Sequence, residues 1–119
     1  MKTALLIATA LLLPSTAVHA QAVATPPVFA TCAACHSVTS GTTSFGPNLR
    51  GVAGRKAASL EDYAYSPALK ASAIVWDAQT LDHWLTSPQK AVPGTKMPFT
   101  GIADPDRRKQ IVDYLLTLR

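Results

Sequence analysis

Apolar residues recur at helical spacing in a few short segments, and the clearest of these is the C-terminal end of the chain. Asp104-Pro105-Asp106 is typical of a helix start, because an aspartate caps the helix, a proline costs nothing at the first position, and a second acid suits the helix dipole. We therefore predict a final helix. Its expected buried stripe consists of Ile111, Val112, Leu115, Leu116 and Leu118.

Two more helices are predicted in the second half of the chain. Asp77 is expected to cap the first of them, which should end before Pro88 because proline breaks the helical pattern. Its apolar residues at i, i+3, i+4 spacing are Ala78, Leu81, Trp84 and Leu85. A shorter helix is predicted from Ser66-Pro67 to about Ser72.

Nearer the N-terminus, Thr25 is expected to cap a helix that opens at Pro26 or Pro27 and runs to about His36. Residues 37–63 are rich in Ser, Thr and Gly and have no sustained period, so they are interpreted as a long loop. No segment alternates apolar and polar residues over the length of a strand. The pattern predicts an all-α domain with long loops.

The first 22 residues do not fit this domain. A lysine at position 2 precedes an apolar run over residues 4–13, and the segment Ala17-Val18-His19-Ala20 then gives a small-x-small end. This order is typical of a secretory signal peptide, with cleavage after Ala20 or Ala22. The run is too short to span a bilayer, which needs about 20 apolar residues, although an uncleaved anchor is the alternative. We expect export to the bacterial periplasm and one mature domain over 23–119.

Composition narrows the remaining possibilities. The chain has 119 residues, 48% of them hydrophobic and 15% charged, which excludes a long disordered polar protein. The net charge of +4 falls to +3 without Lys2, too little for a nucleic-acid surface. All six glycines lie within residues 41–101, and seven of the nine prolines within 26–98. A mature chain of this size buries only about 65% of its unfolded surface, so we expect a disulfide, metal or cofactor to help complete its core.

The two cysteines form the motif Cys32-Ala33-Ala34-Cys35-His36, for which three interpretations compete. A thioredoxin-like pair needs a preceding strand, and here a helix start precedes it. A zinc site needs four ligands, and His83 is the only other histidine after the signal peptide. The third interpretation is attachment of a c-type haem, with two thioethers and an imidazole on one helix face. The third is favoured, and it agrees with export.

The second axial position of such an iron decides between electron transfer and ligand chemistry. Met97 is the only methionine outside the predicted signal peptide, and it lies in the proline-flanked loop Val92 to Pro98. A methionine on a helix stripe would be ordinary core, whereas this loop favours ligation. His83 is the rival ligand. It lies off the apolar face of its helix, which favours a solvated surface residue.

Further segments accompany the motif at regular separations. They are Gly46-Pro47-Asn48-Leu49, Gly51, Gly54-Arg55-Lys56, Tyr65, Ile74-Val75-Trp76, Pro93-Gly94-Thr95-Lys96-Met97 and Ile111 to Leu115. With these segments, residues 23–119 resemble the class I c-type cytochromes, the family that includes mitochondrial cytochrome c. The resemblance implies a mono-haem domain with the cytochrome c fold, in which N- and C-terminal helices pack across one covalently bound haem c with long loops between them.

The resemblance also implies roles for individual residues. Pro47 would offer its carbonyl to the second nitrogen of His36, which fixes the tautomer of the imidazole. Tyr65, Trp76 and Arg55 would donate hydrogen bonds to a buried haem propionate, which would otherwise be unpaired. Leu49, Leu85, Phe99 and Leu115 would pack against the haem, and Tyr114 would help to join the first and last helices. His36 and Met97 would bind the iron.

Some positions depart from the family. Trp84 stands where a tyrosine is common near the methionine sulfur, and an indole donates but does not accept a hydrogen bond. The basic ring that mitochondrial members place around the haem edge is thin, with Lys90 and Lys96 remaining. Strong electrostatic steering to a highly acidic partner is therefore not expected.

These features together predict a periplasmic electron carrier with His/Met axial ligation, and not an enzyme. Its expected partners are redox proteins: a donor dehydrogenase or cytochrome complex and an acceptor oxidase or reductase. Two alternatives stay open, namely a haem enzyme or gas sensor with an open iron site, and a subunit fixed to a dehydrogenase or oxidase. We expect a monomer with no nucleic-acid partner and no stable membrane insertion.

Overall fold

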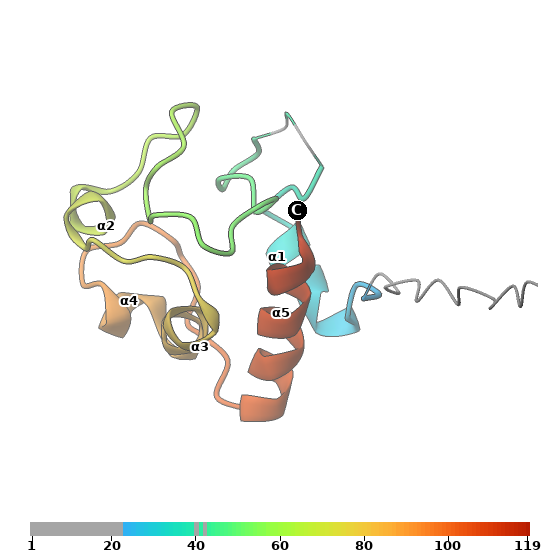
Figure 1. Ribbon diagram of the computed structural model, residues 1–119. Helices are drawn as coiled ribbons and strands as arrows, with labels where there is room; N and C mark the ends of the chain where they lie inside the picture. The colour runs from blue at the N-terminus through green and yellow to red at the C-terminus, as the bar shows by residue number, and fades with distance from the viewer. Residues whose placement is uncertain (1–22, 40, 42) are drawn as a thin grey trace, which may run out of the picture.

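Short helices joined by long loops make up the part of the chain that the computed structural model describes, which is residues 23–39, 41 and 43–119 (Figure 1). The elements in order are a 3-10 helix η1 (Pro27–Phe29) and the α-helices α1 (Ala30–Ala33), α2 (Pro67–Ala71), α3 (Ala78–Thr86), α4 (Pro88–Ala91) and α5 (Pro105–Thr117). Within these residues, extended pairing is limited to one isolated antiparallel bridge, Lys56 to Val75. The predicted all-α class is confirmed. The signal peptide predicted at residues 1–22 lies outside the described residues.

The N-terminal helix differs from its prediction at both ends. Thr25 does not cap it, because the Thr25 hydroxyl donates a hydrogen bond to the Tyr114 hydroxyl on α5 instead (3.1 Å). Pro26, in an extended conformation, takes the position before η1. Regular helix ends at Ala33, before the motif does. A tertiary contact has replaced the local cap.

The helical turn nevertheless continues through the cysteine motif. The carbonyl of Cys32 accepts hydrogen bonds from the backbone N–H groups of Cys35 (3.0 Å) and His36 (2.9 Å). The second of these has the i to i+4 pattern of an α-helix. The five motif residues therefore keep the local geometry on which the sequence argument depended.

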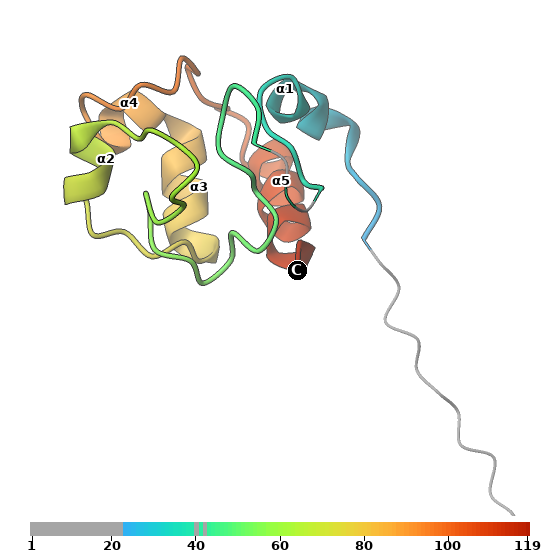
Figure 2. The same cartoon turned by 90° about the horizontal axis from the view of Figure 1, so that it is seen from above.

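Helix α5 packs beside the N-terminal segment, as the two views agree (Figures 1 and 2). The rings of Phe29 and Tyr114 meet edge to face with centroids 4.8 Å apart, as expected for the joint between the first and last helices. The buried residues of α5 are Ile111, Val112, Tyr114 and Leu115. Leu116 and Leu118 of the predicted stripe are half-buried and pack against the core, and Leu118 lies just beyond the end of the helix.

Asp77 caps helix α3, as predicted, and the structure shows that Thr80 completes a capping box. Asp77 accepts a hydrogen bond from the Thr80 N–H (2.8 Å), and the Thr80 hydroxyl oxygen accepts one from the Asp77 N–H (2.9 Å). The Thr80 N–H and the Thr80 hydroxyl both donate to the Asp77 carboxylate, and these two bonds lower the pKa of the Asp77 carboxyl. The helix buries Leu81, Trp84 and Leu85, while Ala78 is exposed, contrary to the predicted stripe.

The chain turns sharply after α3. As predicted, α3 ends before Pro88, but Pro88 itself opens the short helix α4, which the sequence did not indicate. Pro88 is fully buried, which anchors α4 to the core. Gly101 then lies against the end of α3 with φ of 106°. A Cβ there would lie 2.1 Å from the Thr86 carbonyl oxygen, so only glycine permits this approach.

Candidate functional site

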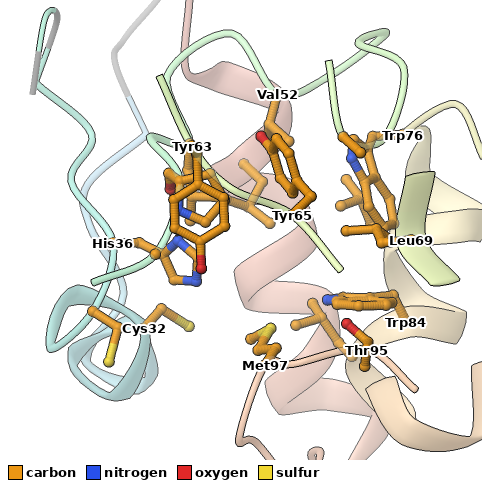
Figure 3. Close-up of a pocket in the computed structure, with 18 of the residues that line it drawn as sticks. Cys32, His36, Val52, Tyr63, Tyr65, Leu69, Trp76, Trp84, Thr95 and Met97 are labelled. Carbon is orange, nitrogen blue, oxygen red and sulfur yellow. The ribbon is translucent and has the colours of Figure 1, made fainter. Parts of the chain in front are cut away.

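A cavity of about 500 Å³ lies between helices α1, α2, α3 and α5 and the loops around them (Figure 3). Its walls are mostly apolar side chains, including Phe29, Leu81 and Ile111. Every site residue predicted from the sequence lines it, although these residues come from distant parts of the chain. They are Cys32, Cys35, His36, Pro47, Arg55, Tyr65, Trp76 and Met97.

The two cysteines lie at the end of the cavity formed by α1. Both are free thiols; Cys32 is buried and Cys35 is exposed. Burial raises the pKa of the Cys32 thiol, because the apolar surroundings disfavour the thiolate. The Cys32 thiol lies inside the cavity wall and the Cys35 thiol at its edge. Both can therefore bond covalently to one group that fills the cavity and extends to the surface.

The imidazole of His36 is held in one orientation. Its Nδ1 lies 2.7 Å from the Pro47 carbonyl oxygen, which accepts only if Nδ1 carries the proton. This tautomer leaves the Nε2 lone pair free to bind a metal. Burial lowers the pKa of His36, with the Pro47 carbonyl acting in the opposite direction, so burial favours the neutral, ligating form.

Gly46 completes the support of that ring. A Cβ built at Gly46 would lie 2.5 Å from Cε1 and 2.7 Å from Nδ1 of His36, closer than atoms can approach. The loop cannot easily retreat, because the Gly46 N–H donates to the Cys35 carbonyl oxygen (2.8 Å). Glycine is therefore required here for space, and the imidazole ring lies flush against the backbone.

This close approach predicts the effect of Gly46→Ala. The added methyl must displace the His36 ring or the loop, and such overpacking costs about 1–3 kcal/mol of unfolding free energy. Guanidinium unfolding measures that loss, and the chemical shifts of the His36 ring protons report the displacement.

Gly51→Ala is the matched control. Gly51 has φ of 67° but no atom within 4 Å of an added Cβ, so the substitution costs about 1–2 kcal/mol through backbone strain alone. It should leave the His36 resonances unchanged. Wild-type resonances in Gly46→Ala would contradict the close packing.

Met97 reaches the cavity from the loop that follows α4. Figure 3 shows its sulfur and the His36 ring turned toward the same space. A turn closed by the Thr95 N–H and the Val92 carbonyl oxygen (3.0 Å) precedes it, with Gly94 at φ of 89°. A thioether sulfur thus approaches the cavity from a different element than the imidazole does.

The three residues expected to bind a propionate lie in the cavity wall. Trp76 is buried and Tyr65 half-buried, and burial raises the pKa of Tyr65, so its hydroxyl remains a donor. Arg55 uses two of its N–H groups within the protein, donating to the carbonyl oxygens of Asn48 (2.8 Å) and Arg50 (3.0 Å). Burial lowers the pKa of Arg55, while nearby Tyr65 acts against that shift. Arg55 therefore stabilises its own loop through hydrogen bonds and also lines the cavity.

Sequence reasoning missed Tyr63, which also lines the cavity. Its ring meets that of Tyr65 edge to face (4.9 Å), and the Lys96 ammonium lies 4.5 Å from its centroid. Lys96 also donates a hydrogen bond to the Ala64 carbonyl oxygen, so it ties the Met97 loop to the tyrosine loop. The signal available in the sequence was the pair of aromatic residues two positions apart in one loop.

The remaining expectations have mixed outcomes. Leu49, Leu85 and Leu115 line the cavity, but Phe99 does not and packs against the core beside it. Trp84 lines the cavity and stacks edge to face on Trp76 with centroids 5.4 Å apart. His83 is exposed and lies outside the cavity wall, as its helix position predicts.

The residues present fit a covalently attached haem. The cavity is broad and apolar, and two thiols at Cys-x-x-Cys spacing, an imidazole with a free Nε2 and a thioether all line it. The absence of a Cβ at Gly46 lets the imidazole lie against its loop. Within the described residues, no three His, Cys, Asp or Glu side chains gather as a zinc site would require.

Known proteins match this chain along most of its length. Residues 26–119 match the family model for cytochrome c. Cytochrome c2 iso-2 of Magnetospirillum molischianum is 42% identical over 94 residues, which are 79% of this chain and 97% of that protein. Cytochrome c2 of Rhodoblastus acidophilus is 48% identical over 89 residues, 74% of this chain and 83% of that protein.

The fold is similar to a solved structure as well. Cytochrome cH from Methylobacterium extorquens superimposes with a TM-score of 0.70 at 47% sequence identity, covering 74% of this chain and 89% of that chain. The predicted cytochrome c fold is thereby confirmed. By its family match, its relatives and its fold, this chain belongs to the cytochrome c family, as a class I mono-haem c-type cytochrome with a covalently bound haem c.

Proposed function

We propose that this cytochrome is a periplasmic electron carrier whose single haem c is attached to Cys32 and Cys35, with His36 and Met97 as axial ligands. The observation that carries the proposal is the convergence of these four side chains on one apolar cavity. The haem supplies a one-electron Fe(II)/Fe(III) couple, and a methionine thioether raises its potential relative to a second histidine. With His36 and Met97 both bound to the iron, no position on it would be left for a substrate, and the protein would only exchange electrons.

The polypeptide has three tasks in this proposal. Pro47 holds His36 as the Nδ1–H tautomer, so the ligand does not rotate or change protonation between redox states. Trp76, Tyr65 and Arg55 offer N–H or O–H donors to the haem propionates, which would otherwise be costly to bury. The apolar wall keeps water away from the haem. Few water molecules therefore have to reorient when the charge of the iron changes.

Redox proteins are the proposed partners, a dehydrogenase or cytochrome complex as donor and an oxidase or reductase as acceptor. Within the part of the chain that the structure describes, no helix is long and apolar enough to cross a bilayer. The proposal includes a signal peptide over residues 1–22, cleaved after Ala20 or Ala22. Such export would agree with the haem assignment, because bacteria attach c-type haem outside the cytoplasm.

Fractionation of a bacterium that produces the full chain tests location and processing together. The periplasmic fraction should contain a red protein whose mass equals one haem plus a chain beginning at Gln21 or Val23. A redox titration of that protein should follow a reversible one-electron curve. A haem-loaded protein of full length in the membrane fraction would contradict the proposed cleavage and location.

A further inference from the structure

A glutamine side chain bridges two backbone carbonyls of the loop that carries Met97. Gln89, on α4, donates through Nε2 to the carbonyl oxygen of Thr95 (2.9 Å) and to that of Met97 (3.1 Å). Both acceptors belong to the segment that places the thioether in the cavity. One carboxamide thus connects Thr95, the last residue of the turn, with Met97.

The Met97 carbonyl is held from two directions. Besides the Gln89 amide, the Phe99 N–H donates to it at 2.9 Å. Fixing this oxygen fixes the peptide plane after Met97, and with it the direction in which the side chain leaves the backbone. Without the amide, the plane is held from the Phe99 side alone.

The support of Gln89 is itself rigid. It follows Pro88, which is fully buried, and α4 is closed by the N–H groups of Ala91 and Val92, which donate to Ser87 and Pro88 (both 2.9 Å). The amide therefore reaches the loop from an anchored base. Its neighbour Lys90 occupies the same helix and is exposed.

From this geometry we infer that Gln89 is a positioning residue for the axial methionine, which keeps the Met97 thioether directed into the cavity by donating to the Thr95 and Met97 carbonyls. The inference rests on the proposed ligation by Met97 and deepens it. The inference assigns the effect to the hydrogen bonds that the carboxamide nitrogen donates, and not to the volume of the side chain.

Imidazole titration of the ferric holoprotein tests the inference, because imidazole binds only where Met97 leaves the iron. The near-red methionine–iron band reports the displacement. In Gln89→Leu, which keeps the volume but lacks donors, imidazole affinity should rise roughly tenfold, as the loss of two solvent-accessible hydrogen bonds implies. Gln89→Glu should raise the affinity further, because its carboxylate faces two carbonyl oxygens with no proton to donate.

Lys90→Leu is the control on the same helix, and it should leave the imidazole affinity within about twofold of the wild type, the range of ordinary surface substitutions. Wild-type affinity in both Gln89 variants would overturn the inference, as would a Gln89→Glu protein that behaves like wild type. A lower unfolding midpoint with unchanged imidazole affinity would also overturn it, since Gln89 would then only stabilise the fold. A wild-type protein without the near-red band would instead overturn the ligation by Met97, and this inference with it.

Discussion

Replacing Cys32 and Cys35 together by serine should leave the chain largely unfolded. The two thiols are the covalent attachment for the haem, and the cavity that the haem fills measures about 500 Å³. At about 24 cal/mol for each Å³ left empty, a cavity of that volume corresponds to about 12 kcal/mol. This is comparable with the whole stability of a small domain, about 5–15 kcal/mol, so we expect the haem-free chain to lose this fold.

Near-ultraviolet circular dichroism and guanidinium unfolding of the haem-free double variant measure this outcome. The single variant Cys35→Ser is the control. It keeps the buried Cys32 as one attachment point, and it should fold around its haem with reduced stability. A haem-free double variant with native-like aromatic signals and a cooperative unfolding transition would show that the protein core does not need the cofactor.

Removing the methionine ligand should open the iron to small molecules. If Met97 binds the iron as proposed, it competes with carbon monoxide in the ferrous wild-type protein, and only the minor state with Met97 detached binds carbon monoxide. If that state is about 1% populated, Met97→Ala should bind carbon monoxide roughly a hundredfold more tightly, because the competing ligand is gone. Spectrophotometric titration of both proteins gives the ratio.

His83→Ala is the matched control for Met97→Ala. His83 is the rival ligand named by the sequence, but its side chain is exposed and does not line the cavity. The control should bind carbon monoxide as weakly as the wild type. If His83→Ala opened the iron and Met97→Ala did not, the ligand assignment would have to be reversed.

Local signals explain what the sequence predicted well. The capping box at Asp77 and Thr80 and the start at Asp104 and Pro105 satisfy their helix ends within a few residues, so α3 and α5 form where they are expected. The haem motif is local too, since one helical turn sets its geometry. Residues from distant segments could be placed in one cavity only through the resemblance to a family.

The features that the sequence did not predict involve contacts between distant segments. Thr25 looks like a cap, but its hydroxyl bonds to Tyr114, 89 residues away. Gly46 looks like any loop glycine until the His36 ring is seen to lie against it. The role of Gln89 depends on a turn that brings Met97 back to α4. Hydrophobic periodicity contains no information about such pairings, because it reports only the face that a residue occupies on its own element.

The central claim is that His36 and Met97 together close the iron of a single haem c. The optical spectrum of the purified ferric wild-type protein at neutral pH tests it most directly. We predict a low-spin spectrum with a weak near-red band from the bond between the Met97 sulfur and the iron. A high-spin ferric spectrum without that band would contradict the account, because it would show an iron with an open axial position.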